Sequence, residues 1–266
     1  MEERGKIVKE NRYPLFEGKR VLKKEMLWAL RDYLFAHVYL EYQEYEPGII
    51  QGCKIQVQEK ELIVGPGIVK CKDFVCLSGD EIRISYQPSD SLQILKFWAE
   101  AEIKEGDSII FHMGLSLEES LEKKDNEFEL CRFHLRHGAR LRDDYKNFAD
   151  MATEYDTINL IYADWSGIGG KTLAHEVTRR FARELLSAKE ILPEDRVFAY
   201  QCLSERGSVP VEILMDYVRG RRNLEREEEL KIPNIYEYLC MILKEIVVGG
   251  GQKKSGKKEK RKIWIE

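Results

Sequence analysis

The first part of the chain has the hydrophobic period of a helix. From residue 21 to residue 42, apolar residues recur at spacings of three and four, which places them on one helical face. These residues are Leu22, Met26, Leu27, Leu30, Tyr33, Leu34 and Val38. Pro47-Gly48 then supplies a turn. The pattern predicts a helix over 21–42 that ends before this turn.

After the turn the period changes to two. Lys54–Gln58 alternates polar and apolar residues, and Glu61–Val64 continues as a second strand until Gly65-Pro66-Gly67 interrupts it. Further strands are predicted at Phe74–Leu77, Glu81–Ser85, Leu92–Ile103, Ser108–Gly114 and Glu127–Leu135. Short strands at close intervals favour an antiparallel sandwich or barrel.

The second half of the chain is rich in helix-forming residues. From about Asp144, amphipathic runs at 171–188 and 226–247 predict helices. We therefore expect an α+β protein with an N-terminal helix and an antiparallel β-sandwich (residues 1–142), followed by an α-helical bundle (143–248). Residues 249–266 hold seven Lys or Arg residues against two Glu, so we expect a basic, disordered tail.

Composition narrows the function classes. The chain has 266 residues, 34% of them charged, and a net charge of −4, which argues against a surface that binds nucleic acid throughout. No apolar run is long enough to span a membrane, and the first residues contain no apolar signal segment. Six cysteines without a CxxC pair favour reduced thiols and a cytoplasmic location.

The sharpest chemical motif is Gly169-Gly170-Lys171-Thr172, preceded by the apolar run 158–163. Gly170, Lys171 and Thr172 match the end of a P-loop, in which backbone N–H groups and the lysine bind phosphate. However, Trp165 occupies the position of the first P-loop glycine. A degenerate nucleotide-binding or nucleic-acid-binding (helicase-like) protein is therefore the alternative hypothesis. The plainer interpretation is a glycine-rich connection that carries a surface lysine.

Metal sites and catalytic sites find little support. Cys131, His134 and His137 include two ligand types that zinc prefers, but strand alternation would turn Cys131 and His134 to opposite faces. Asp143-Asp144 is more typical of a solvated turn. The basic tail contains one aromatic residue, Trp264, so stacking on bases is weakly supported. We therefore expect no enzyme activity, no cofactor and no metal. Nucleic acid is not the expected partner, and a nucleic-acid adaptor that binds through the basic tail is the second alternative.

Several motifs occur together in a recognisable order. An aromatic-Glu-Gly motif, Phe16-Glu17-Gly18, precedes the helix. It is followed by Gly48-Ile49-Ile50-Gln51-Gly52 and by Leu62–Gly67. Further on, Glu127–Phe133 runs into Gly138-Ala139-Arg140-Leu141. Over residues 13–190 this order resembles the TssK family, baseplate proteins of type VI secretion systems that are related to the shells of phage receptor-binding proteins.

The chain also departs from this family. The family's helix normally begins with Pro-Gln-His, where this chain has Lys23-Lys24-Glu25. Members are longer, and the portion expected to be missing is the C-terminal one that contacts the membrane-anchored complex.

The resemblance implies a structural adaptor at the baseplate of a contractile, phage-tail-like injection apparatus. It implies a homotrimer whose β domain attaches to wedge proteins and whose helices pack around the three-fold axis. The partner-binding residues carried over are Phe16, Glu17, Gly18, Leu22, Met26 and Trp28. The plainer interpretation is that Leu22 and Met26 are core residues and Gly18 only turns the chain.

Overall fold

The structure, a computed structural model, describes residues 14–100, 103–106, 108–227 and 229–249. The chain divides into two compact units, Met1–Glu44 and Tyr45–Glu266. The expected division at residue 142 stays a prediction. The expected basic tail lies, apart from Gly249, outside the described residues.

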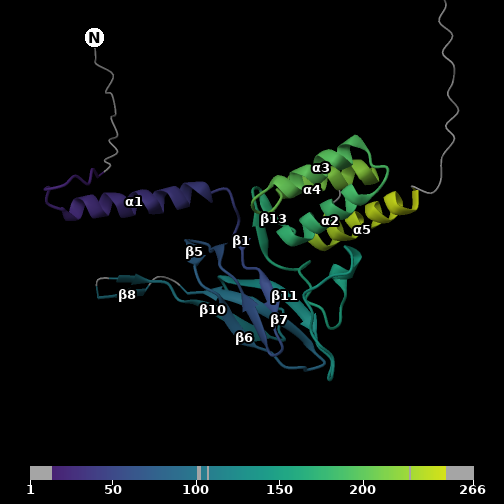
Figure 1. The fold of residues 1–266 in the computed structure, drawn as a ribbon, viewed down its shortest axis with the longest axis horizontal. Helices are drawn as coiled ribbons and strands as arrows, with labels where there is room; N and C mark the ends of the chain where they lie inside the picture. The colour runs from purple at the N-terminus through teal and green to yellow at the C-terminus, as the bar shows by residue number, and fades with distance from the viewer. Residues whose placement is uncertain (1–13, 101–102, 107, 228, 250–266) are drawn as a thin grey trace, which may run out of the picture. The chain divides into compact units, whose positions relative to one another are not determined.

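The first unit contains one long helix, α1 (Lys24–Glu41) (Figure 1). The helix predicted over 21–42 is thus confirmed, but it begins three residues later because Lys23 still has extended backbone angles. Leu22 consequently lies ahead of the helix rather than on its face. At the other end, the N–H of Tyr42 donates to the carbonyl of Val38 and closes the last turn.

The largest sheet of the second unit joins segments from both halves of the sequence. Its strand order is β13-β12-β1-β4-β5. The strands are β1 (Gly48–Gly52), β4 (Gly67–Lys70), β5 (Val75–Ser78), β12 (Trp165–Gly167) and β13 (Gly170–Thr172). β1 pairs with β12 in parallel, and every other pairing in this sheet is antiparallel. Residues beyond 142 therefore complete a sheet that begins at residue 48.

The remaining strands form three smaller antiparallel sheets. They are β2-β3-β6 (Ile55–Val57, Glu61–Val64, Ile82–Ser85), β10-β7-β11 (Met113–Glu118, Leu92–Ala99, Glu127–His134) and β8-β9 (Ile103–Glu105, Ser108–Ile110). The two strands predicted at Lys54–Gln58 and Glu61–Val64 are confirmed, and they pair as an antiparallel hairpin. The single strands expected at 92–103 and 108–114 were wrong, because each contributes to two different sheets.

Glycines at both ends of β1 are required by close backbone contacts. A Cβ on Gly48 would lie 2.6 Å from the carbonyl oxygen of Asp164. Gly52 has a φ of +75°, and a Cβ there would lie 2.2 Å from the carbonyl oxygen of Pro66. Steric contacts therefore explain why the sequence motif has a glycine at each end of this strand.

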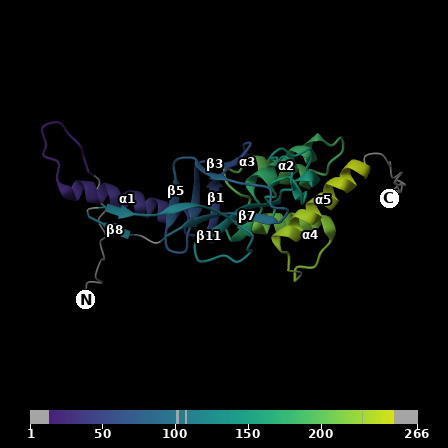
Figure 2. The same cartoon turned by 90° about the horizontal axis from the view of Figure 1, so that it is seen from below.

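In the part of the chain that the structure describes, four helices follow the last strand: α2 (His175–Ser187), α3 (Pro193–Ser204), α4 (Val211–Arg222) and α5 (Ile232–Gly249). Both views show them gathered at one end of the second unit (Figures 1 and 2), where Figure 1 also places β13, while most of the other strands lie toward the other end. The helix expected over 171–188 begins only at His175, because 171–172 belong to β13. The helix expected over 226–247 is α5, displaced by a few residues.

Aromatic side chains pack these helices against one another and against Phe148, which lies between β11 and β12. Phe181 of α2 packs edge-on against Phe148, which precedes the short 3₁₀ helix Ala149–Ala152, and against Phe198 of α3. Phe198 stacks on Tyr217 of α4 at 3.9 Å between ring centroids. The Tyr236 hydroxyl of α5 donates to the carbonyl of Phe148. Antiparallel sheets and several helices together confirm the α+β class.

Candidate partner-binding surface and buried ionic cluster

Helix α1 has apolar side chains on two opposite sides. At 100° per residue, Trp28, Phe35 and Tyr39 fall within one narrow stripe. Charged residues flank this stripe, with Lys24 and Arg31 on one edge and Glu25 and Asp32 on the other. The broad opposite side carries Met26, Leu27, Leu30, Tyr33, Leu34, Val38 and Leu40. Because apolar residues lie on both sides, no single contact surface would cover them.

These apolar side chains are accessible in the described chain. No residue of α1 is buried, and the side chain of Trp28 is 48% exposed. Lys24 places its ammonium 5.0 Å from the centre of the Trp28 ring, so a lysine of the same helix covers part of that indole. Met26 is half-buried. Within the first unit, neither Leu22 nor Met26 is enclosed in a core.

The residues ahead of α1 form an exposed turn. Phe16 is 61% exposed, and Leu22 is exposed as well. Glu17 accepts the backbone N–H of Arg20 and pairs with its guanidinium at 2.7 Å. The left-handed residue of this turn is Lys19, with a φ of 67°, rather than Gly18. Phe16, Glu17, Gly18 and Leu22 thus lie in one short exposed segment next to the helix.

The P-loop motif adopts a different structure from the one its sequence suggests. Gly170, Lys171 and Thr172 form strand β13 of a tight hairpin with β12, in which Ser166 pairs with Lys171. Helix α2 begins three residues after Thr172, so Lys171 does not stand at a helix N-terminus. The preceding run 158–163 forms an irregular segment rather than a strand, buried except for Tyr162 and with one isolated bridge, at Asn159. The strand–loop–helix geometry that a P-loop requires is absent from these residues.

The polar atoms of the motif have partners within the protein. The ammonium of Lys171 pairs with Asp164 at 2.7 Å, and the Thr172 hydroxyl donates to the carbonyl of Val209 at 2.6 Å. The nucleotide-binding alternative therefore loses its geometric basis, and Lys171 instead belongs to an ionic cluster.

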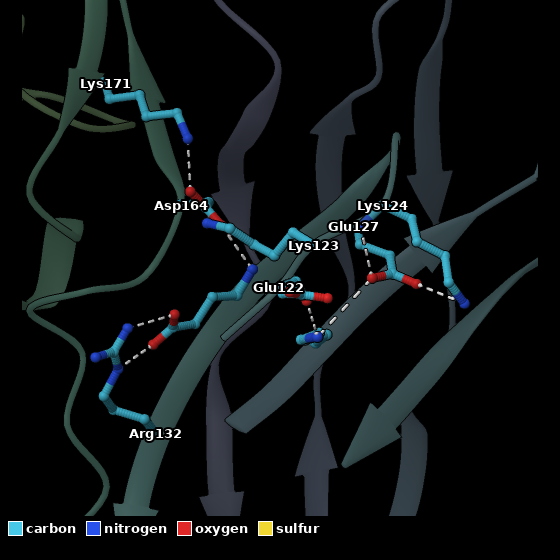
Figure 3. Close-up of polar contacts among 9 residues, drawn as sticks. Glu122, Lys123, Lys124, Glu127, Arg132, Asp164 and Lys171 are labelled. Atoms are coloured by element: carbon cyan, nitrogen blue, oxygen red, sulfur yellow. Dashed lines mark hydrogen bonds and ion pairs between the residues drawn. The ribbon is translucent and has the colours of Figure 1, made fainter. Parts of the chain in front are cut away.

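Asp164 is the centre of this cluster (Figure 3). Its side chain is 5% exposed and accepts hydrogen bonds from Lys171, from Lys123 at 2.6 Å and from the backbone N–H of Glu129 at 2.8 Å. Burial acts to raise the pKa of this carboxyl, but the two lysines and the N–H outweigh it and lower the pKa. Asp164 thus connects the β10–β11 loop to the β12–β13 hairpin.

The neighbouring strands carry two further buried charges. Glu129 of β11 accepts a bidentate pair of hydrogen bonds from Arg132, at 2.6 and 2.7 Å. Lys96 of β7 is 1% exposed, and its ammonium donates to Glu118 at 2.8 Å and to the carbonyl of Glu122 at 2.5 Å. Every buried charge here has an opposite partner, which is the condition under which charges are tolerated inside proteins. The arrangement fits a structural role.

The sequence reasoning did not identify this cluster. One signal was present: Lys96 interrupts the apolar run Ile94-Leu95-Lys96-Phe97-Trp98, and Asp164 lies between apolar neighbours. Their partners, however, come from segments up to 41 residues away.

The histidines and cysteines of the proposed metal motif are not brought together. Cys131 is buried in β11, where a bulge falls between Glu129 and Cys131. His134 stacks near Tyr155, and His137 lies 3.5 Å from Asp90. Among the described residues, no group of three or more His, Cys, Asp or Glu side chains could hold a metal ion. Within the same residues, no helix has both the length and the apolar character needed to cross a bilayer.

An open groove of about 1080 Å³ lies between the β2–β3 turn and the segments that follow β6 and β11. Its floor includes Tyr86, Leu135 and Leu141, and its rim includes Lys60 and Arg140. The hydroxyl of Tyr86 already donates to the carbonyl of Gln58, so the main polar group of the floor is satisfied.

The chain was compared with known proteins. No family model and no curated protein matches it. A crystal structure of TssK aligns with 91% of this chain and 72% of its own, with a TM-score of 0.42 and 8% identity. A chain of the type VI secretion system TssK-TssF-TssG baseplate subcomplex aligns over 88% of this chain and 100% of its own (TM-score 0.40, 9% identity).

A third aligned structure is a baseplate complex from the type VI secretion system, which covers 90% of this chain and 57% of its own (TM-score 0.32, 10% identity). Of these three aligned structures, one is named as TssK and two are named as baseplate complexes of the type VI secretion system. At these TM-scores the alignments carry no argument about function, which has to be inferred from the residues of the chain itself.

Proposed function

We propose that this protein is a structural component of the baseplate of a contractile, phage-tail-like injection apparatus. The proposal is supported by the order of motifs that resembles the TssK family. Three of these motifs coincide with elements of the second unit: β1, β3 and β11. Gly48 and Gly52 are required sterically, which gives the first of these motifs a physical basis.

The observation that carries the proposal is the exposure of α1. The helix presents Trp28, Phe35 and Leu34 to solvent on two sides. An apolar surface of this extent is usually covered by an interaction partner. Aromatic anchors of this type dominate the binding energy of protein interfaces. α1 and the exposed turn at Phe16 and Leu22 are therefore the partner-docking element, and wedge proteins of the baseplate are the proposed partners.

The oligomer proposed is a homotrimer whose helical region packs around the three-fold axis. Cyclic symmetry is the usual state of soluble homo-oligomers. Three copies of the 31.2 kDa chain would have a mass of about 94 kDa.

Light scattering coupled to size exclusion tests this state on the purified chain. The expected mass is about 94 kDa, unchanged by ATP and magnesium. A mass of one chain at every concentration would refute the trimer. A mass that depends on ATP would refute the purely structural function and would favour the alternative, in which Lys171 binds a nucleotide.

Docking is tested separately, by purifying the assembly from native cells and identifying its components by mass spectrometry. Trp28→Ala combined with Leu22→Ala should remove the wedge proteins and leave the oligomer intact. Tyr162→Ala, which also removes an exposed aromatic side chain but from the second unit, is the matched control and should retain them. Equal retention by both variants would refute docking through α1.

A further inference from the structure

A small pocket in the second unit has no role in the proposal above. It lies between the β1–β2 connection and the start of α2 and has a volume of about 200 Å³. Its walls are mostly apolar and include Leu130, Leu160 and Trp165. Pockets for whole small molecules usually enclose about 300–1,000 Å³. The volume therefore suits a group the size of one side chain.

Glu176 supplies the acidic group of this pocket. It is the second residue of α2 and lines the cavity half-buried. No hydrogen bond or ion pair joins its carboxylate to any of the described residues. Burial raises the pKa of Glu176, and the nearby charge of Asp143 raises it further. The charged form of a half-buried carboxylate without a hydrogen-bond or ion-pair partner is stabilised by any cation that reaches it.

The other polar groups at the pocket do not neutralise Glu176 directly. His175 lies beside it, but its Nε2 is 3.2 Å from the carbonyl of Glu205, and burial together with Arg179 lowers its pKa. His175 is thus neutral at physiological pH. Lys54 lines the pocket and lowers the pKa of Glu176, yet no ion pair within 4.0 Å forms between them. Lys54, Asp143 and Glu176 together carry a net charge of −1.

We propose that this pocket receives one lysine or arginine side chain from a partner protein. The aliphatic stem of such a side chain would lie against the apolar walls, and its charged end would reach the carboxylate of Glu176. Trp165 forms part of the wall, and indole rings attract cations more strongly than other aromatic side chains do. The inference is independent of docking through α1, since the two surfaces share no residue.

The experiment uses n-butylammonium as a probe, because it reproduces the stem and charge of lysine. The full-length chain is labelled with ¹⁵N and titrated, and the Trp165 indole and the Cys53 amide report occupancy. n-Butanol, which has the same stem without charge, is the matched ligand. We expect n-butylammonium to saturate these resonances and n-butanol to bind about tenfold more weakly.

Three variants decide the assignment. Glu176→Gln should weaken n-butylammonium binding about tenfold. Glu212→Gln is the matched control, because Glu212 is likewise the second residue of its helix, α4, but lines neither cavity described above. It should change nothing. Lys54→Gln should strengthen binding, since it removes the competing cation. A purely structural Glu176 would not produce this gain.

Equal binding of n-butylammonium and n-butanol would overturn the proposal, because the pocket would then select apolar groups alone. Equal binding by the Glu176→Gln and wild-type chains would overturn it too. Neither result would affect the oligomer mass or the docking tests of α1, so a failure here is distinguishable from a failure of the proposed baseplate function.

Discussion

At the scale of single residues, the strongest stability effect is expected at Asp164. Asp164→Ala leaves Lys123 without its partner and removes an acceptor from the Glu129 N–H. Breaking a buried ion pair in this way costs about 3 kcal/mol of the free energy of unfolding. Urea unfolding measures the loss. Asp73→Ala, which alters an exposed turn, is the control and should change the free energy by less than about 0.5 kcal/mol.

The same carboxyl makes a pH prediction. Because the folded pKa of Asp164 is lowered, its contribution is fully present above the unfolded pKa of about 3.9 and is lost as pH falls through the folded value. Between about pH 5 and pH 3 the wild-type chain should therefore lose more stability than Asp164→Asn does. Parallel pH profiles of the two chains in urea unfolding would contradict this assignment.

A second buried acid secures the start of α3. Asp195 is fully buried and accepts hydrogen bonds from the Tyr217 hydroxyl at 2.9 Å and from the N–H of Leu192 at 3.1 Å. Tyr217→Phe removes one hydrogen bond and leaves the stacked ring, so we expect a loss of about 1–2 kcal/mol in chemical denaturation. Tyr200→Phe, on the exposed side of α3, should have no measurable effect. Similar values for both variants would show that the Asp195 contact adds no stability.

At the scale of elements, α1 differs from the described helices of the second unit because none of its residues is buried. Trp28→Ala should change the free energy of unfolding by less than about 0.5 kcal/mol, because the indole is half exposed and lies beside Lys24 of the same helix. Trp165→Ala removes an indole that is 7% exposed and should cost about 3 kcal/mol or more. A comparable loss at both positions would mean that α1 contributes to a core.

Sequence patterns identified the elements whose signals are local. Strand β2 follows from the alternation over Lys54–Gln58, β3 from the apolar residues that come after Glu61, and α1 from its apolar spacing. The β12–β13 hairpin could not be recognised in this way. Its strands, Trp165-Ser166-Gly167 and Gly170-Lys171-Thr172, are short and glycine-rich, so they resembled a phosphate-binding loop. β12 is ordered by pairing with β1, more than 110 residues earlier, and a local pattern contains no information on that contact.

The same limit applies to the sites. Apolar spacing predicted one apolar face on α1, but the spacing of residues does not state whether that face is covered within the chain or by a partner. Asp164 and Lys96 are conspicuous only once their partners are known, because a charged residue in an apolar run indicates a paired charge without naming the pair. The pocket at Glu176 is formed by residues of β1, β2, β11, β12 and α2, and only the folded structure brings these together.

At the scale of the whole molecule, the division into two units predicts independent folding of the second. The hydrophobic core of the described residues contains no residue before Ile49. A chain that begins at Tyr45 should therefore unfold cooperatively, with a melting temperature within about 2 °C of the full chain. Differential scanning calorimetry makes the comparison, and far-ultraviolet circular dichroism should lose only the signal of α1.

The truncated chain also separates the two contacts proposed for the baseplate. If the helices α2–α5 hold the trimer, the chain without α1 keeps three copies and loses the wedge proteins, because their docking element is gone. A fall to one copy would place the oligomer contact on α1 instead. In that case the two apolar sides of the helix would contact other copies of α1, and Trp28→Ala in the full chain should dissociate the oligomer in light scattering. Retention of both the trimer and the wedge proteins would leave α1 without a role in assembly and would refute the proposal at its main point.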